Sequence, residues 1–361
     1  MRTGLRQFPP IPLGTDHLFL LLLGLPRHML IFFSIDDNHA SRTVLILCLL
    51  WFTFAPSHAL SQTKYSRQQD AALAKIPFDG KSAFEVLLAV CQLGPRITGS
   101  KAMQAQQEML ISHFEQLGAT IRKQEFTVKD PNTGSPVPVV NLIVQWHPEK
   151  KKRLLLCCHY DTRPFPDKDP TNPKGVFLGA NDGASSVALF HQLGKTMPKL
   201  ACRYGVDFVF FDAEEFVFDR RRDPLFVGST HFSNRYLNEP PGHQYVSGVL
   251  IDMIGDKKLD LFYERNSMQY APILTRGIWG TARKLGVKEF IPREKHTVRD
   301  DHLPLNRIAR IPTTDIIDFD YPSPNSRNSY WHTTKDTPSN CSALSLAKVG
   351  WVLREWLKEV K

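Results

Sequence analysis

Four short, mostly apolar runs constrain the fold of this chain more than any other feature of its sequence. They cover residues 153–158, 205–211, 247–251 and 313–317, and each ends at a cluster of polar residues. Short apolar runs separated by helical segments, such as residues 184–197, are typical of parallel strands that are buried on both faces. The pattern therefore predicts an α/β fold with a mostly parallel central sheet flanked by helices.

Two further strands are predicted at residues 125–128 and 139–145, on either side of a turn rich in Asp, Pro, Asn and Gly. They would form the edge of the sheet and make it mixed. Helical periodicity or polar amphipathic character predicts helices at residues 83–93, 103–117 and 342–360. Neither an internal repeat nor a long linker divides residues 66–361, so we expect one domain there.

The first 59 residues are set apart by two apolar stretches. Residues 44–55 follow a basic residue and precede Ser57 and Ala59, which is the pattern of a signal peptide with a small-residue cleavage site. We expect cleavage after Ala59 and an exported protein, either secreted or periplasmic. Because a second apolar stretch lies upstream, we interpret residues 1–59 as an N-terminal extension plus a signal peptide, with an internal start such as Met29.

The alternative for this segment is an N-terminal membrane anchor, which would be the chain's only contact with a membrane. It is disfavoured because residues 36–39 place two aspartates, an asparagine and a histidine between the two apolar stretches. Hydrocarbon does not readily accommodate such side chains.

Composition narrows the classes of partner and excludes disulfide scaffolds. The formal net charge of +9 is compatible with an anionic partner, but Lys and Arg are dispersed except at residues 150–153 and 220–222. We interpret both runs as solvated loops and expect no nucleic-acid partner. The six cysteines are irregularly spaced and form no C-x-x-C motif, so neither a disulfide framework nor a zinc finger is predicted.

Six acidic and histidine side chains stand at strand ends or in loops that lead into helices. They are His159, Asp182, Glu214, Glu215, Asp252 and His332. Ligands of open α/β sheets bind beyond the carboxyl ends of the strands, so we expect these side chains to share one site. Carboxylate oxygens and imidazole nitrogens are suitable zinc ligands.

Each residue also has an ordinary structural explanation when taken alone. Asp182 precedes a helix and is in a position to cap it, and paired glutamates commonly begin a solvated helix. The coincidence of all six nevertheless favours a metal site. The pair Glu214 and Glu215 is the most informative, because neighbouring side chains point in different directions and one can bind metal while the other carries protons.

These motifs resemble those of the zinc-dependent aminopeptidase family, which also contains the animal-type glutaminyl-peptide cyclotransferases. The matching segments are CHYD at 158–161, GAND at 179–182, FFDAEE at 210–215, IDMIG at 251–255, DDHLP at 300–304 and WHT at 331–333. Together with further matches at 94–96, 99–100, 176–178 and 228–229 they cover nearly the whole predicted domain. The DDH triplet that begins at Asp300 and the Trp331 that precedes His332 favour the cyclotransferase branch.

The resemblance implies an acyltransferase that converts the N-terminal glutamine of a peptide or protein to pyroglutamate and releases ammonia. It implies one zinc ion, and the implied zinc ligands are Asp182, Glu215 and His332. It also implies catalytic roles for Glu214 in proton transfer and for Asp252 and Asp300 in positioning. Trp331 would form a wall of the substrate pocket. The oligomeric state is left open.

An aminopeptidase mechanism uses nearly the same residues. In that alternative Asp182 bridges two zinc ions, His159 and Asp252 hold the second zinc, and Glu214 activates a water molecule for hydrolysis of the peptide bond. A binding protein without catalysis is the least favoured class, because Glu214 and all the ligands are present.

Two departures from the animal cyclotransferases affect the expected pocket. Asp315 stands where they carry a histidine, and residues 216–223 contain three consecutive arginines where they place a tryptophan near the substrate. The resemblance is therefore stronger for the fold and the zinc site than for the reaction.

Overall fold

The computed structural model describes residues 67–322 and 329–360. The predicted signal peptide and its cleavage site lie outside the described residues, so export stays a prediction. The described residues all belong to one compact unit, Lys64–Lys361. Within the described ranges, none of the helices combines the length and the apolar character needed to cross a membrane.

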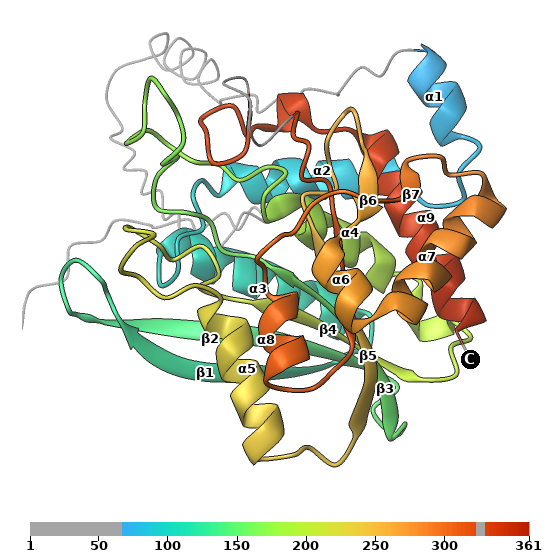
Figure 1. Cartoon of the computed structure of the whole chain (residues 1–361), viewed down its shortest axis with the longest axis horizontal. Coiled ribbons are helices and arrows are strands. Elements are labelled where there is room, and N and C mark those ends of the chain that lie inside the picture. The colour runs from blue at the N-terminus through green and yellow to red at the C-terminus, as the bar shows by residue number, and fades with distance from the viewer. Residues whose placement is uncertain (1–66, 323–328, 361) are drawn as a thin grey trace, which may run out of the picture. The chain divides into compact units, whose positions relative to one another are not determined.

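The central sheet contains six strands in the order β1-β2-β4-β3-β5-β8 (Figure 1). Their bounds are β1 Thr120–Lys129, β2 Pro136–Trp146, β3 Lys152–His159, β4 Gly205–Phe211, β5 Gln244–Asp252 and β8 Thr313–Ile317. Strands β4, β3, β5 and β8 are parallel, and β2 runs antiparallel to both β1 and β4. This arrangement confirms the predicted α/β class and its mixed, mostly parallel sheet.

Alternating side chains of the central strands pack on opposite faces of the sheet. On β3, Leu154 and Leu156 belong to one hydrophobic cluster, whereas Leu155 and Cys157 belong to another. Both faces of the strand are thus apolar because both are covered, which explains the uninterrupted apolar run in the sequence. Each fully buried aliphatic side chain contributes about 1.5–3 kcal/mol to folding.

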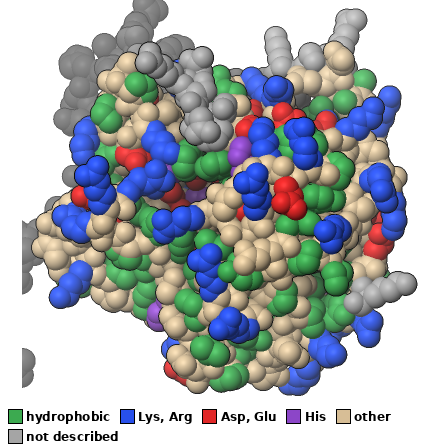
Figure 2. Space-filling view, in the orientation of Figure 1, with side chains coloured by type: hydrophobic (Ala, Val, Ile, Leu, Met, Phe, Trp, Pro, Cys, Tyr) green, Lys and Arg blue, Asp and Glu red, His purple; other side chains and the backbone are tan. Residues whose placement is uncertain are grey.

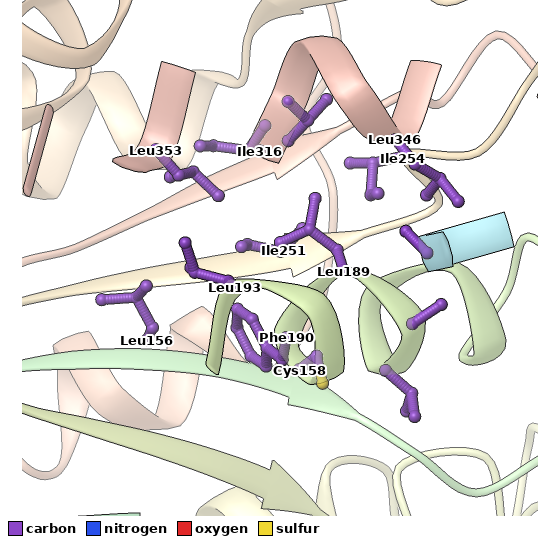
Figure 3. Close-up of a cluster of buried hydrophobic side chains, with 14 of the residues drawn as sticks. Leu156, Cys158, Leu189, Phe190, Leu193, Ile251, Ile254, Ile316, Leu346 and Leu353 are labelled. Atoms are coloured by element: carbon purple, nitrogen blue, oxygen red, sulfur yellow. The ribbon is translucent and has the colours of Figure 1, made fainter. Parts of the chain in front are cut away.

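More helices cover one face of the central sheet than the other. The larger cluster joins the sheet to α2 (Gly80–Gln92), α3 (Lys101–Gln116), α4 (Ala184–Gly194), α7 (Pro272–Leu285) and α9 (Ala343–Glu359). Figure 3 shows this core, where Leu189 and Phe190 of α4 lie among strand residues such as Leu156 and Ile251. The opposite face packs against α5 (Val227–Asn238) and α8 (His302–Arg307), which lie in front of the sheet in Figure 1.

Several elements were not predicted from the sequence. They are α1 (Arg67–Leu73), η1 (Met197–Lys199), α5, α6 (Arg265–Tyr270), α7, α8, η2 (Pro338–Asn340) and the parallel pair β6 (Leu261–Tyr263) and β7 (Phe290–Glu294). Most of them are too short to show a hydrophobic period. Strands β6 and β7 are 3 and 5 residues long and are separated by helices α6 and α7, so only the tertiary fold pairs them.

The run at residues 150–153 departs from the interpretation of a solvated loop. Arg153, the second residue of the central strand β3, is fully buried and pairs with Asp207 of β4. The run at residues 220–222 is exposed, as expected. Lys and Arg side chains are widely spread over the face shown in Figure 2, where Asp and Glu side chains appear at few places. The five described cysteines are buried and unpaired.

Candidate metal centre and active site

The carboxyl ends of the parallel strands bring the predicted site residues to one edge of the sheet. His159 is the last residue of β3, Asp252 is the last residue of β5, and the pair Glu214 and Glu215 follows β4. The loop before α4 supplies a further carboxylate, and the loop after β8 supplies the tryptophan and the second histidine. Residues as far apart in sequence as 159 and 332 therefore converge because parallel strands end on the same side.

Two groups of donor atoms in this region could each hold a metal ion. One group contains Asp182, Glu215 and His332, and the other contains His159, Asp182 and Asp252; within each group the ligand atoms lie within 4.8 Å of one another. Asp182 is common to both. Its Oδ1 lies 3.2 Å from His159 Nε2, and its Oδ2 lies 3.6 Å from His332 Nε2.

The surroundings of Asp182 fit a metal ligand better than a helix cap. The residue at the N-cap of α4 is Gly183, and no side chain caps that helix. Asp182 Oδ2 is buried without a hydrogen-bond partner among the described residues. A buried carboxylate oxygen without a partner is costly, and a cation beside it would remove that cost. The residues present therefore fit a metal ion.

Unusual backbone conformations hold the ligands in place. Ala213, Met253 and His332 have φ values of 59°, 51° and 55°, in the left-handed region that side chains seldom adopt. Gly183 has φ 99°, and a Cβ there would lie 3.0 Å from Asp161 O and 3.3 Å from the His159 ring. Close packing around the candidate metal ligands therefore requires glycine at this position.

Two further carboxylates fix the loops that carry the ligands. Asp161 accepts hydrogen bonds from the backbone N–H groups of Glu214 and Glu215, at 3.2 and 2.9 Å. Asp336 accepts from the N–H groups of Asn181 and Asp182, at 2.8 and 3.1 Å. Each ligand loop is thus held by a buried side chain that belongs to a distant segment.

A loop after β3 encloses His332 and Glu215. Arg163 Nη1 lies 2.7 Å from both carboxylate oxygens of Glu215, and Arg163 Nε lies 2.7 Å from Asp167 Oδ1. The same Asp167 oxygen is 3.2 Å from His332 Nδ1. The N–H of Lys168 donates to the carbonyl of His332 at 3.1 Å. Such contacts fix the orientation of a histidine ligand.

The two adjacent glutamates have opposite electrostatic surroundings. Burial and the neighbouring Glu215 carboxylate raise the pKa of Glu214 well above its ordinary value. Burial acts in the same direction on Glu215, but Arg163 and His332 outweigh it and hold its pKa well below the ordinary value. No hydrogen bond to the Glu214 carboxylate is found among the described residues. Glu215 is therefore a fixed anion, whereas Glu214 is free to exchange a proton.

Other acids near Glu214 also have raised pKa values. Burial, then Asp252 and Asp301, raise the pKa of Asp300 well above its ordinary value. Burial outweighs the Ser229 hydrogen bond and raises the pKa of Asp301 to about 7. Asp315 is fully buried, and burial and Asp300 raise its pKa well above its ordinary value. So many confined carboxylates cannot all be ionised without a cation nearby.

A pocket of about 380 Å³ opens onto these groups. Its lining includes Asp182, Glu214, Glu215, Asp252, Asp300, Trp331 and His332, together with Arg163, Arg220, Arg299 and the apolar side chains of Leu225, Phe226, Val298, Ile317 and Phe319. All the predicted catalytic and substrate-binding residues therefore line one cavity. His159 lies beneath them and is not part of the lining.

Sequence reasoning missed three residues of the site. Arg163 and Asp167 lie close after the HYD motif, but the sequence does not indicate that they contact Glu215 and His332. Asp336 lies in a polar loop and has no distinguishing pattern. Only the proximity of aspartate and arginine to a known ligand motif could have drawn attention to the first two.

Solved structures of two bacterial proteins are similar to this chain. The solved glutaminyl cyclase of Fimbriiglobus ruber is 37% identical, with a TM-score of 0.74 and coverage of 79% of this chain and 96% of that chain. A Zn-dependent exopeptidase from Parabacteroides distasonis is 30% identical, with a TM-score of 0.72 and coverage of 78% and 98%.

A bovine glutaminyl-peptide cyclotransferase is 25% identical over 250 residues, which are 61% of this chain. The match spans 65% of the bovine protein, slightly less than two thirds of its length. Peptidase family M28 matches residues 141–357, a range that begins in β2 and ends in α9 and contains every predicted metal ligand. The chain therefore belongs to peptidase family M28, a family of enzymes.

Proposed function

We propose that this protein is a glutaminyl-peptide cyclotransferase, which converts the N-terminal glutamine of peptides to pyroglutamate and releases ammonia. The observation that carries the proposal is that Asp300 and Trp331 line the same pocket as Glu214 and the ligand group. These are the residues whose motifs favour the cyclotransferase branch. The likeness to solved glutaminyl cyclases supports the same activity.

Asp182, Glu215 and His332 would hold a single zinc ion. When bound, zinc polarises the γ-amide carbonyl of the substrate and stabilises the negative charge that develops on its oxygen. Arg163 keeps Glu215 anionic and oriented for this role. Asp167, 3.2 Å from His332 Nδ1, orients the His332 ring.

The remaining residues act on the substrate's amine and leaving group. The α-amine attacks the γ-carbonyl carbon of its own side chain, so the reaction gains from high effective molarity. Glu214 takes the proton from the amine as the new C–N bond forms, and delivers it to the nitrogen that departs as ammonia. Asp252 and Asp300 hold the amine beside Glu214, and Trp331 packs against the glutamine side chain.

The aminopeptidase alternative is favoured by one observation, the presence of Asp182 in both donor groups. A carboxylate that belongs to both donor groups could serve as a ligand of two zinc ions. His159 and Asp252 would then hold the second ion, and Glu214 would activate water.

Incubation of the purified protein with H-Gln-Ala and with Leu-p-nitroanilide tests the proposal. Release of ammonia from H-Gln-Ala without release of p-nitroaniline is the expected result. The dipeptide product should also have lost its free amine, because cyclisation consumes it. Release of p-nitroaniline alone would replace the proposal with the aminopeptidase alternative.

We also propose that the protein is exported, because residues 44–55 precede a small-residue cleavage pattern. N-terminal sequencing of secreted material is expected to start at Leu60. Recovery of mature protein with residues 1–59 intact would contradict this proposal.

A further inference from the structure

The pocket has an acidic floor and a basic mouth. Its metal-binding and acidic lining residues Asp182, Glu215, Asp252 and Asp300 are buried. The two arginines in the lining that are exposed to solvent are Arg220 and Arg299. Because exposure increases from the floor to the mouth, these two arginines mark the entrance.

A third cation, Lys168, contacts the aromatic wall of the pocket without belonging to the pocket lining. Lys168 Nζ is 2.9 Å from the centroid of the Trp331 ring, and Arg220 Cζ is 5.4 Å from the same centroid. Trp331 itself lines the pocket. Two cations therefore contact the aromatic wall, and the exposed arginine run at residues 220–222 contributes one of them.

Arg220 and Arg299 differ from other arginines of this region in their lack of an acidic partner among the described residues. Arg163 pairs with Glu215, and Arg222 pairs with Asp223 at 3.0 Å. Among residues 67–322 and 329–360, neither Arg220 nor Arg299 forms an ion pair with an aspartate or glutamate. Their charges are thus available to a ligand.

The chemistry of the floor determines which part of a substrate meets these cations. The glutamine side chain and its amine must reach Glu214, so the backbone leads outwards from the floor. The next residue is about 3.3–3.6 Å further along an extended chain. A peptide that leads outwards in this way would bring its second side chain towards the mouth, where Arg220 and Arg299 line the pocket.

We propose that Arg220 and Arg299 make this enzyme selective for peptides that carry an acidic residue directly after the N-terminal glutamine. The inference rests on the proposed cyclotransferase function and names its substrate class. An aspartate or glutamate side chain there accepts hydrogen bonds from the guanidinium groups. A lysine at the same position is repelled.

Three amidated tripeptides test the proposal: H-Gln-Glu-Ala-NH2, H-Gln-Gln-Ala-NH2 and H-Gln-Lys-Ala-NH2. Their second side chain is the only group that differs in charge. We expect kcat/KM for ammonia release to be roughly threefold to tenfold higher with Glu than with Gln, because each exposed charge pair contributes modestly. The ratio should decrease at high salt, which screens exposed charges.

Substitutions of the two arginines test whether the preference for an acidic second residue arises at the pocket mouth. In Arg220→Gln, Arg299→Gln and the double variant, the Glu-to-Gln ratio should decrease towards one, and the double variant should show the largest change. The matched control is Arg276→Gln, which removes one exposed arginine from α7, outside the pocket lining. In this control the ratio should equal that of the unaltered protein.

The possible results separate this inference from the proposed function. Ammonia release at equal rates from all three peptides would overturn the inference and leave the cyclotransferase function intact. A ratio that decreases as much in Arg276→Gln as in Arg299→Gln would overturn it too, because overall charge would then explain the preference. No ammonia from any peptide would overturn both.

Discussion

Strands β3 and β4 carry buried polar groups near both of their ends, and the two ends differ in how these groups are satisfied. At the amino ends, Arg153 of β3 donates from Nε to Asp207 Oδ1 at 3.0 Å and from Nη1 and Nη2 to surrounding carbonyl oxygens. The other Asp207 oxygen accepts from Tyr245 at 2.5 Å. At the carboxyl ends, Asp182 Oδ2 and His159 Nδ1 are buried without a hydrogen-bond partner among the described residues.

The difference separates structural polar groups from functional ones. A satisfied buried ion pair has no need of a ligand, whereas buried donor atoms without partners have a cost that a bound ion removes. The amino-terminal cluster therefore serves the fold. The proposed role of the carboxyl-terminal cluster is in metal binding and catalysis, so its substitutions should change metal binding or rate before they change stability.

The largest expected effect is on the rate of the Glu214→Gln variant. Glutamine keeps the size of the side chain but cannot accept and return a proton, so turnover should decrease about 10²–10⁴-fold. Bound zinc, measured by atomic absorption, should stay at the level of the unaltered protein. Ammonia release measured by a coupled assay gives the rate.

Glu215→Gln and His332→Ala are the comparison variants, because each removes a proposed zinc ligand. Both should lose zinc as well as activity. If Glu214→Gln loses zinc while Glu215→Gln retains it, the two glutamates have the reverse roles. If neither Glu214→Gln nor Glu215→Gln changes the rate or the zinc content, the active site lies elsewhere.

Arg153→Met should have the largest effect on stability. It leaves the fully buried Asp207 carboxylate without its cation, which typically costs about 3–5 kcal/mol of unfolding free energy. Urea unfolding would measure the loss, and zinc content per folded molecule should not change. The double variant Arg153→Met with Asp207→Leu should recover much of the stability. A stable Arg153→Met protein that has lost zinc would contradict the division between the two ends.

The ionisation of Glu264 predicts how the stability of the fold depends on pH. Burial opposes its ionisation, but His302 and backbone N–H groups outweigh it and lower the pKa of Glu264 to about 2. The carboxylate accepts from the N–H groups of Asn266, Ser267 and Val298. Because the folded-state pKa is lower than the ordinary 4.5, ionised Glu264 stabilises the fold above that pH. The contribution, about 3 kcal/mol by linkage, is lost as pH falls from about 4.5 towards 2.

Thermal unfolding across this pH range checks the expectation. Glu264→Gln should be less stable than the unaltered protein at neutral pH and should approach it at acid pH, where both side chains are uncharged. The titratable side chains that face Glu264 are His302, at 3.5 Å, and Asp315. Parallel unfolding curves with a constant difference at every pH would show that the Glu264 charge has no such role.

The smallest effect is expected where a charge pair is exposed. Lys284 Nζ lies 3.0 Å from Glu359 Oε2, and both side chains are largely in solvent. Lys284→Gln should change the unfolding free energy by less than about 0.5 kcal/mol, because such pairs are screened by water and salt. If Lys284→Gln loses as much unfolding free energy as Arg153→Met, burial does not determine how much an ion pair contributes to stability.

Much of the fold could be predicted from the sequence. Strands β4 and β8 have the bounds that their apolar runs predict, and α2, α3, α4 and α9 lie where helical spacing predicts them. The failures have a physical reason. Helix α8 and strands β6 and β7 are too short for a hydrophobic period. The burial of Arg153 could not be predicted, because its partner Asp207 is remote in sequence.

The sequence by itself determined the types of donor and their positions at strand ends. Hydrophobic period and chain order are local properties, so they place His159, Asp252 and the Glu214 and Glu215 pair at one edge of a parallel sheet. The tertiary structure alone decided what surrounds these ligands. Loop paths determine the contacts of Arg163 with Glu215 and the support of the Asp182 loop by Asp336. They also determine the position of the mouth arginines, which have no acidic partner in the described part of the chain. Such paths are fixed by packing between segments far apart in the chain, which no local pattern records.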